Sequence, residues 1–130
     1  MKFSTKAEYG LKAMTNLAQC YPEQKTIGEI AKEENISQKY LERLMGFLRD
    51  GEVVQSAKGK QGGYTLARDP KKIPVGEIIE LLDGEIAPMR CVGKFCASEH
   101  KCPSSMVWNK LGVQIKKTLY DIKLSTLIMK

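Results

Sequence analysis

Three cysteines lie close together in the second half of the chain: Cys91, Cys96 and Cys102. The stretch around them, residues 85–102, mixes glycine with charged residues and follows neither a strand nor a helix period, which predicts a loop. Three thiolates on one short loop can converge on a single metal centre, because soft ligands select zinc, copper(I) or iron–sulfur clusters. The spacing therefore predicts a loop that binds a metal or a cluster.

The composition places this loop in a reducing setting. The chain has no run of about 18 apolar residues, and its first residues lack an apolar signal-peptide core, so we expect a cytoplasmic protein without a membrane partner. Disulfides are rare in the cytoplasm, and clustered cysteines there favour metal or redox chemistry over a pair of disulfides. The net charge of +6 and the pI of about 9.1 suit a polyanionic partner.

The first fifty residues carry the signals of three helices. Thr5–Glu8 has the form of a capping box, and apolar residues at helical spacing predict a helix from about Lys6 to Cys20. A second capping box at Thr26–Glu29 opens a short helix that ends near Asn35. A serine then precedes a third helix over Gln38–Asp50. A short helix, a tight turn and a longer helix form a helix-turn-helix arrangement.

A β-hairpin is predicted directly after this arrangement. Residues 52–56 and 64–67 have strand character, and the basic, glycine-rich turn 58–63 joins them. A hairpin in this position is a wing, so we expect a mostly α-helical fold with a small β-hairpin, a winged helix-turn-helix. Residues 37–72 carry eight basic and four acidic side chains, which places most of the net charge where phosphates would be met.

DNA contacts are expected from the first turns of the third helix and from the wing. Glutamine and arginine suit bidentate contacts with adenine and guanine edges, and wing lysines suit phosphates or the minor groove. The candidates are Ser37, Gln38, Lys39, Tyr40, Arg43, Lys58 and Lys60, with the tyrosine divided between packing and a phosphate contact. The alternatives are an ordinary solvated surface and an adaptor that uses the winged helix for protein contacts. No pairing of nucleophile and base indicates an enzyme.

The last third of the chain predicts two more helices. One starts at Ile73-Pro74 and ends at Gly84, and Pro103 opens a longer one. An apolar stripe on the longer helix is interpreted as a homodimer seam, with intramolecular core as the alternative; its members include Trp108, Leu111, Ile115, Leu119 and Ile122. The expected organisation is a DNA-binding domain at 1–84, a cysteine loop at 85–102, and a dimerisation helix with a C-terminal turn at 103–130.

Several motifs occur together in a specific order along almost the whole chain. They are the opening Met1–Gly10, the reader Ile36–Leu44, the wing Lys58–Tyr64, the helix start Ile73–Ile79, and the three-cysteine loop followed by Trp108. With this set the chain resembles the Rrf-two family of bacterial winged-helix regulators, particularly its iron–sulfur branch. Members without the cysteines exist, so the resemblance implies DNA binding more firmly than it implies a cluster.

The resemblance implies a transcriptional regulator that binds palindromic operator DNA as a homodimer, with half-sites about one helical turn apart. It implies an iron–sulfur cluster, 2Fe–2S rather than 4Fe–4S, held by the three cysteines and reporting cluster status, redox state or nitric oxide. Zinc, a cluster-free repressor and a bare thiol switch are the alternatives. Whether the loaded or the empty form binds DNA stays open.

The fourth ligand stays open because this sequence departs from the branch. The first cysteine gap is one residue shorter than expected, and Ser105 stands where cluster-binding members place a histidine. By resemblance to nitric-oxide-sensing members, Glu8 of the partner subunit could supply a carboxylate. Its other roles are the capping box or a pair with Lys12. His100, inside the loop, is the second candidate, and with the three cysteines it would complete a tetrahedral zinc site.

Overall fold

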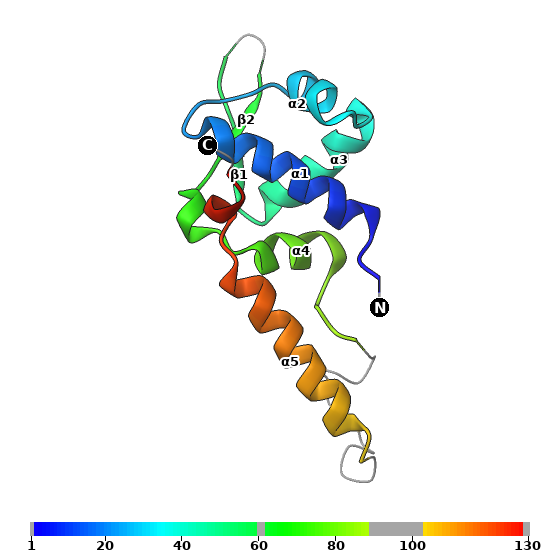
Figure 1. The fold of residues 1–130 in the computed structure, drawn as a ribbon. Helices are drawn as coiled ribbons and strands as arrows, with labels where there is room; N and C mark the ends of the chain where they lie inside the picture. Colours follow the sequence, from blue (N-terminus) through cyan, green and yellow to red (C-terminus); the bar gives the residue numbers. More distant parts are fainter. Residues whose placement is uncertain (1, 60–61, 89–102, 129–130) are drawn as a thin grey trace.

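The computed structural model describes residues 2–59, 62–88 and 103–128, and in these ranges helices dominate. A two-stranded antiparallel hairpin follows three helices, as Figure 1 shows. In order, the elements are α1 (Thr5–Cys20), α2 (Ile27–Glu34), α3 (Gln38–Asp50), β1 (Val54–Ser56), β2 (Tyr64–Leu66), η1 (Pro70–Lys72), α4 (Val75–Asp83), α5 (Ser105–Asp121) and η3 (Leu124–Leu127). The predicted winged helix-turn-helix fold is confirmed.

One apolar core joins α1, α2, α3, the hairpin and α4. Helical spacing puts Met14 and Leu17 of α1 against Leu44 and Leu48 of α3, and all four are fully buried. The C-terminal turn contributes as well, because Leu124 of η3 is fully buried in the same cluster. The reading helix α3 is therefore held on a rigid base by side chains from both ends of the chain.

The start of α1 differs from the prediction. Ser4, not Thr5, is the N-cap: its hydroxyl accepts a hydrogen bond from the backbone N–H of Ala7 at 3.3 Å. The backbone N–H of Ser4 donates to the Asp83 carboxylate at the end of α4, at 3.0 Å, and its hydroxyl contacts the same carboxylate. The predicted capping box at Thr5–Glu8 is therefore wrong, and the cap lies one residue earlier, at a serine that also contacts α4.

The hairpin is shorter than predicted. Glu52 has a φ of 61°, the left-handed region, so it belongs to the turn after α3 and β1 begins at Val54. The register pairs Val54 with Leu66 and Ser56 with Tyr64. The inward residues Val54 and Leu66 are buried against α3, which fixes the root of the wing next to the reading helix.

Helix α4 lies very close to two neighbours at glycine positions. A Cβ built on Gly10 of α1 would lie 2.1 Å from Leu82 Cδ1, and a Cβ on Gly76 of α4 would lie 2.2 Å from the Tyr120 ring of α5. Both distances are far below van der Waals contact. The absence of side chains at these two positions therefore allows α4 to pack directly against α1 and α5.

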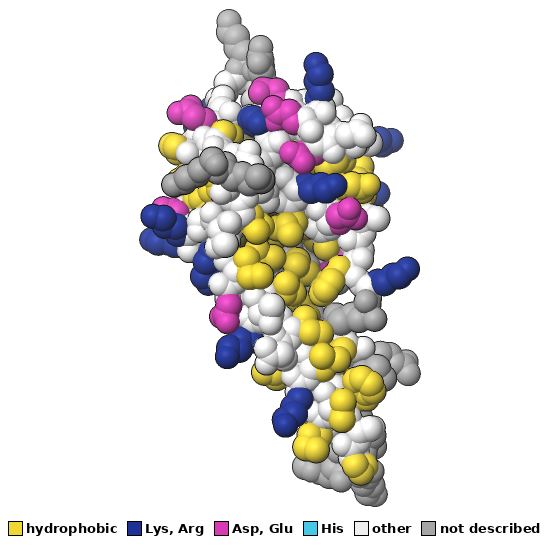
Figure 2. Space-filling model, viewed as in Figure 1, with side chains coloured by type: hydrophobic (Ala, Val, Ile, Leu, Met, Phe, Trp, Pro, Cys, Tyr) yellow, Lys and Arg dark blue, Asp and Glu magenta, His cyan; other side chains and the backbone are white. Residues whose placement is uncertain are grey.

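Helix α5 leaves the rest of the molecule as an arm (Figure 1). Its inner half packs through Ile115 and Leu119 on a second cluster, which comprises Ala7, Val75, Ile79 and Ile86. Ile122 packs there too but is the C-cap, because the helix ends at Asp121. The outer half exposes apolar side chains, which Figure 2 shows along the arm: Met106, Val107, Leu111 and Val113.

The chain returns to the head after α5. The backbone N–H of Val75 donates to the Ile122 carbonyl at 2.8 Å, and that of Leu124 donates to the Ile73 carbonyl, also at 2.8 Å. These bonds attach the root of the arm to the start of α4. Within residues 2–59, 62–88 and 103–128, no helix combines the length and apolar character needed to cross a bilayer.

Replacement of Gly76 tests the close approach of α4 and α5. Gly76→Ala is expected to lower the free energy of unfolding by about 1–3 kcal/mol, because the new methyl group meets an aromatic ring that has to move. Gly46→Ala is the matched control, since no atom lies within 4 Å of a Cβ at this position of α3, and it should stabilise by up to about 1 kcal/mol. Denaturant unfolding of both variants measures the difference; equal effects would contradict the close packing.

Candidate DNA-binding surface

The exposed face of α3 carries the cations Lys39 and Arg43 together with the exposed Glu42 and Phe47. Ser37 caps the helix, with its hydroxyl accepting from the Tyr40 backbone N–H at 3.3 Å, as the sequence predicts. Lys39 and Arg43 are one turn apart, both exposed, on the side opposite the buried leucines. Gly46 continues this row with open space above it. The exposed side of α3 therefore carries two cations followed by a glycine, and the opposite side of the helix is buried in the core.

Tyr40 and Gln38 lie at the edges of this face. The Tyr40 ring packs edge-on against Tyr9 of α1, with centroids 6.0 Å apart, and its hydroxyl lies 3.4 Å from the Thr5 hydroxyl. Packing is therefore its observed role. The Gln38 side chain lies beside α2, where a Cβ on Gly28 would be 3.7 Å from its Oε1. Gln38 thus sits in the angle between the two helices of the helix-turn-helix motif.

The wing presents a second cation. Lys58 is exposed two residues beyond the end of β1. The hairpin closes behind it, with the Ala57 backbone N–H donating to the Gly63 carbonyl at 2.8 Å and that of Gly62 to the Gly59 carbonyl at 3.2 Å. The predicted partner Lys60 lies outside the described residues. Lys58 on the wing and the two cations on α3 are thus all exposed.

A third strand-like segment supports the wing, and the sequence analysis missed it. Lys25, in the connection between α1 and α2, pairs with Tyr64 of β2 through two backbone hydrogen bonds of 2.9 and 2.7 Å. No alternation of apolar and polar residues precedes α2, so periodicity gave no signal. The signal in the sequence is the glycine pair Gly62-Gly63, which by itself indicates only a turn.

The three cysteines of the predicted loop lie in a part of the chain that the structure does not describe. Cys91, Cys96, Cys102 and His100 all lie outside the residues that the structure describes. The donor set named by the sequence, three thiols on one segment, has the chemistry that zinc and iron–sulfur centres require.

The proposed fourth ligand Glu8 lies on an exposed part of α1. Its carboxylate pairs with Lys12 Nζ at 3.9 Å, and its backbone N–H donates to the Ser4 carbonyl at 3.2 Å. The pair with Lys12 that the sequence offered as an alternative is therefore present. Such an exposed pair contributes little and leaves the carboxylate at the surface.

A polar junction stands where the chain enters the loop region. The Glu80 carboxylate of α4 accepts from the backbone N–H of Ile86 at 3.0 Å and from the Tyr120 hydroxyl, and Lys116 Nζ lies 3.6 Å away. Burial acts to raise the pKa of Glu80, but the hydrogen bonds and the lysine lower it overall. Burial and the bond to Glu80 raise the pKa of Tyr120 to about 12. The loop entrance, α4 and α5 thus meet at one carboxylate.

Comparison with known proteins identifies the scaffold. A family model named Rrf2, described as an iron-dependent transcriptional regulator, matches residues 3–130. The chain belongs to the Rrf2 family. The Rrf-two resemblance drawn from the reader, wing and cysteine motifs is therefore confirmed.

Two relatives with different names have similar identities to this chain. IscR of Sodalis glossinidius is 35% identical over 130 residues, covering 98% of this chain and 79% of that protein. CymR of Bacillus subtilis is 34% identical over 128 residues, covering 98% of this chain and 89% of that protein. Both are HTH-type transcriptional regulators.

Solved Rrf2 structures show the same fold. CymR, the global cysteine regulator of B. subtilis, matches with a TM-score of 0.80 at 32% identity, over 98% of this chain and 95% of that chain. IscR of T. potens matches with a TM-score of 0.75 at 40% identity, over 96% and 84%. The protein is therefore a DNA-binding transcriptional regulator, and its relatives confirm the prediction that it is not an enzyme.

The junction at Glu80 predicts a late-titrating tyrosine. The folded protein favours the neutral phenol of Tyr120 over the phenolate. The contribution of this tyrosine to the free energy of unfolding is therefore complete below pH 10 and is lost as the pH rises through about 12. The difference in phenolate absorbance between the native protein and Tyr120→Phe should show a midpoint near pH 12. Glu80→Gln should move this midpoint towards 10, whereas a midpoint already at 10 in the native protein would contradict the junction.

Proposed function

We propose that this chain is an iron–sulfur-dependent transcriptional regulator that acts in the cytoplasm and binds palindromic operator DNA as a homodimer. The observation that carries the DNA-binding part is the exposed basic row of α3 beside the wing cation. The three-thiol loop between this head and the arm carries the cluster part.

The described geometry supports reading through the major groove. Arg43 is suited to a guanine edge, and Lys39, on the same face, is suited to a phosphate or a base. Lys58 projects from the wing towards the neighbouring backbone of the duplex, where a lysine meets phosphates in sequence-independent fashion. A single head would read only a half-site, so an operator with two-fold symmetry needs two heads.

The outer half of α5 supports assembly through the arm. Met106 is 64% exposed, Val107 54% and Leu111 42%, on a helix that projects away from the core. Side chains of this kind are normally covered, and a patch that continues along one helix suits the same helix of a second copy. Trp108, half-buried on the same stretch, belongs to this proposed seam. Ile115, Leu119 and Ile122 of the predicted seam are partly committed to the protein's own core.

The donor set supports an iron–sulfur cluster, and the family description of an iron-dependent regulator agrees with it. Cys91, Cys96 and Cys102 would hold the cluster, with Glu8 of a second subunit as the fourth donor. When bound, the cluster would supply a redox-sensitive and labile centre. A harder carboxylate beside three thiolates gives one weaker bond, which suits a site that responds to oxidant, nitric oxide or cluster scarcity.

A regulator without a cluster is the second candidate. The similarity to CymR, a global cysteine regulator, favours it, because CymR of B. subtilis is 34% identical to this chain and IscR of S. glossinidius is 35% identical. Zinc bound by the three cysteines and His100, or a thiol switch, would then occupy the loop. In either case the state of the loop would act through the junction at Glu80, where the loop entrance meets both the head and the arm.

Removal of the wing cation tests the DNA-binding surface. Lys58→Ala should weaken binding about fivefold at low salt and reduce the slope of log affinity against log salt by about 1 per wing, because fewer counterions are released. Lys117→Ala, an exposed lysine of α5, is the matched control and should change neither quantity. Fluorescence anisotropy with a duplex selected by the protein from a random pool measures both. An unchanged slope for Lys58→Ala would remove the wing from the contact surface.

Anaerobic purification tests the cluster. The protein should be brown, with visible charge-transfer absorption and matching iron and sulfide contents, and Cys96→Ala should abolish all three. Cys20→Ala is the control, because this half-buried thiol at the end of α1 donates to the Leu17 and Glu23 carbonyls and belongs to the head. Colourless protein with one zinc per chain would establish the second candidate instead.

A further inference from the structure

We propose that Lys25 is the positioning residue of the wing, holding it at the angle from which its tip reaches DNA. The inference rests on the proposed DNA-binding role of the wing and adds the residue that sets its geometry. The wing anchor comprises Asn16, Lys25, Glu33 and Glu34. Lys25 connects this anchor to the hairpin, with its backbone on one side and its side chain on the other.

The backbone of Lys25 extends the hairpin on its open edge. Its N–H donates to the Tyr64 carbonyl at 2.9 Å, and its carbonyl accepts from the Tyr64 N–H at 2.7 Å. Since Tyr64 also pairs with Ser56 of β1, β2 is held from both sides. Thr65 adds a bond from its hydroxyl to the Pro22 carbonyl at 3.2 Å. An isolated two-stranded hairpin is marginal in water, and this bridge gives it one more backbone attachment to the rest of the fold.

Gly63 makes this close pairing possible. A Cβ built at this position would lie 2.7 Å from the Lys25 carbonyl oxygen, and the φ of +138° is one that other residues rarely adopt. The glycine pair where the turn meets β2 therefore serves the contact with Lys25 as well as the turn. The approach of backbone to backbone is specific to this position, since a Cβ on the neighbouring Gly62 would meet nothing within 4 Å.

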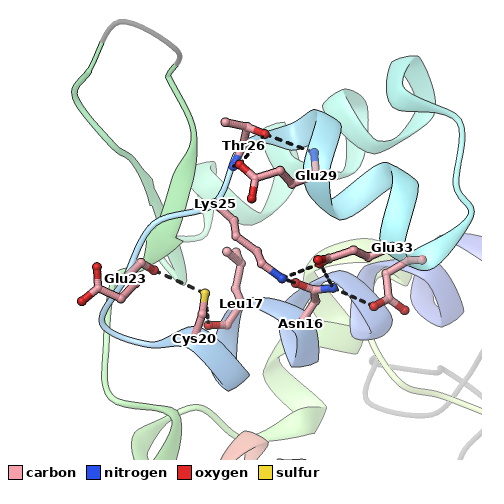
Figure 3. A network of polar contacts seen from close by, with 9 residues as sticks. Asn16, Leu17, Cys20, Glu23, Lys25, Thr26, Glu29 and Glu33 are labelled. Atoms are coloured by element: carbon pink, nitrogen blue, oxygen red, sulfur yellow. Dashed lines mark hydrogen bonds and ion pairs between the residues drawn. The ribbon is translucent and has the colours of Figure 1, made fainter.

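The side chain of Lys25 reaches into the helices behind the wing, as Figure 3 shows. Its ammonium donates to Asn16 Oδ1 of α1 at 2.8 Å and pairs with the Glu33 carboxylate of α2. Asn16 in turn donates to Glu33 at 3.0 Å and to Glu34 at 2.7 Å. These hydrogen bonds from Lys25 and Asn16 lower the pKa of the Glu33 carboxyl, which keeps it charged.

Burial of Asn16 distinguishes the anchor from an ordinary surface ion pair. Asn16 is 7% exposed and the Lys25 side chain is 21% exposed, whereas the Glu33 side chain is 48% exposed, so the bond from Lys25 to Asn16 is the part of the anchor that lies away from water. A buried amide needs its partners, because an unpaired one costs free energy. The ammonium of Lys25 is already shared by two acceptors, which assigns this lysine to holding the wing and leaves the phosphate contact to the exposed Lys58.

The geometry converts a small tilt at the base into a large displacement at the tip. Lys58 lies four residues beyond Val54, roughly 13 Å at the usual strand rise. A tilt of about 15° at the base would move it by about 3 Å, enough to break a contact with a phosphate. Loss of the anchor should therefore remove the contribution of Lys58 to binding even though Lys58 itself is unchanged.

A double-mutant cycle between Lys25→Met and Lys58→Ala tests this dependence, again with a duplex selected from a random pool by the native protein. Lys25→Met should weaken binding about fivefold and reduce the salt slope by about 1 per wing. In the Lys25→Met background, Lys58→Ala should then cost less than about 1.5-fold, against about fivefold in the native background. Lys25→Arg, which keeps a cation in the anchor, should restore the full effect of Lys58→Ala.

Two further variants complete the design. Lys32→Met, an exposed lysine of α2 outside the anchor, is the matched control and should leave the effect of Lys58→Ala at about fivefold. If Lys25→Met fails to fold by circular dichroism, Glu33→Gln replaces it, since it removes the ion pair but keeps the bond to Asn16, and a smaller coupling of the same sign is expected.

The outcomes separate the two proposals. If the loss of DNA affinity in the double variant equals the product of the losses in Lys25→Met and Lys58→Ala, the two residues act independently. That result would overturn the positioning role and make Lys25 an independent phosphate contact. If Lys58→Ala has no effect in the native background, the wing does not contact DNA and the proposed function of that surface fails first. Full coupling with rescue by Lys25→Arg establishes the positioning role.

Discussion

The arrangement of α1, α3 and α5 depends on how closely each of them packs against α4. Three glycines allow that approach by leaving room for large side chains: Gly10 for Leu82, Gly51 for Leu81, and Gly76 for Tyr120. Interiors are packed tightly enough that such contacts have few alternative arrangements. One short helix, α4, thereby sets the positions of α1, of the turn after α3, and of α5. Ser4 adds a polar link from the start of α1 to the end of α4.

Signals that act within a few residues were readable from the sequence. The capping box at Thr26–Glu29 forms, Asn35 adopts the left-handed conformation that ends α2, and the third helix has the predicted bounds Gln38–Asp50. The basic character of the exposed face of α3 followed from the same periodicity, because buried and exposed positions alternate with the helical repeat. Fold class and most of the candidate surface were predictable for this reason.

Features that depend on distant residues were not predictable. The cap residue Ser4 is hydrogen-bonded to Asp83, 79 residues away, and Lys25 joins the hairpin through backbone bonds that do not depend on its side chain. A stripe of apolar residues on α5 does not reveal which half is covered by the protein's own core, since both halves share one period. In each case a single sequence lists the side chains but not their partners.

The chain returns to the N-terminal domain after α5, so that α5 is attached at its inner end and projects from there. Bonds around Ile122 and Leu124 fix the inner end, while the 17 residues of the helix extend about 25 Å from it. Rotation by about 10° at this inner end would carry the outer end through about 4 Å. In the proposed homodimer, in which the arms join at their outer ends, the distance between the two DNA-binding domains would depend on the angle at which Tyr120 packs on Gly76.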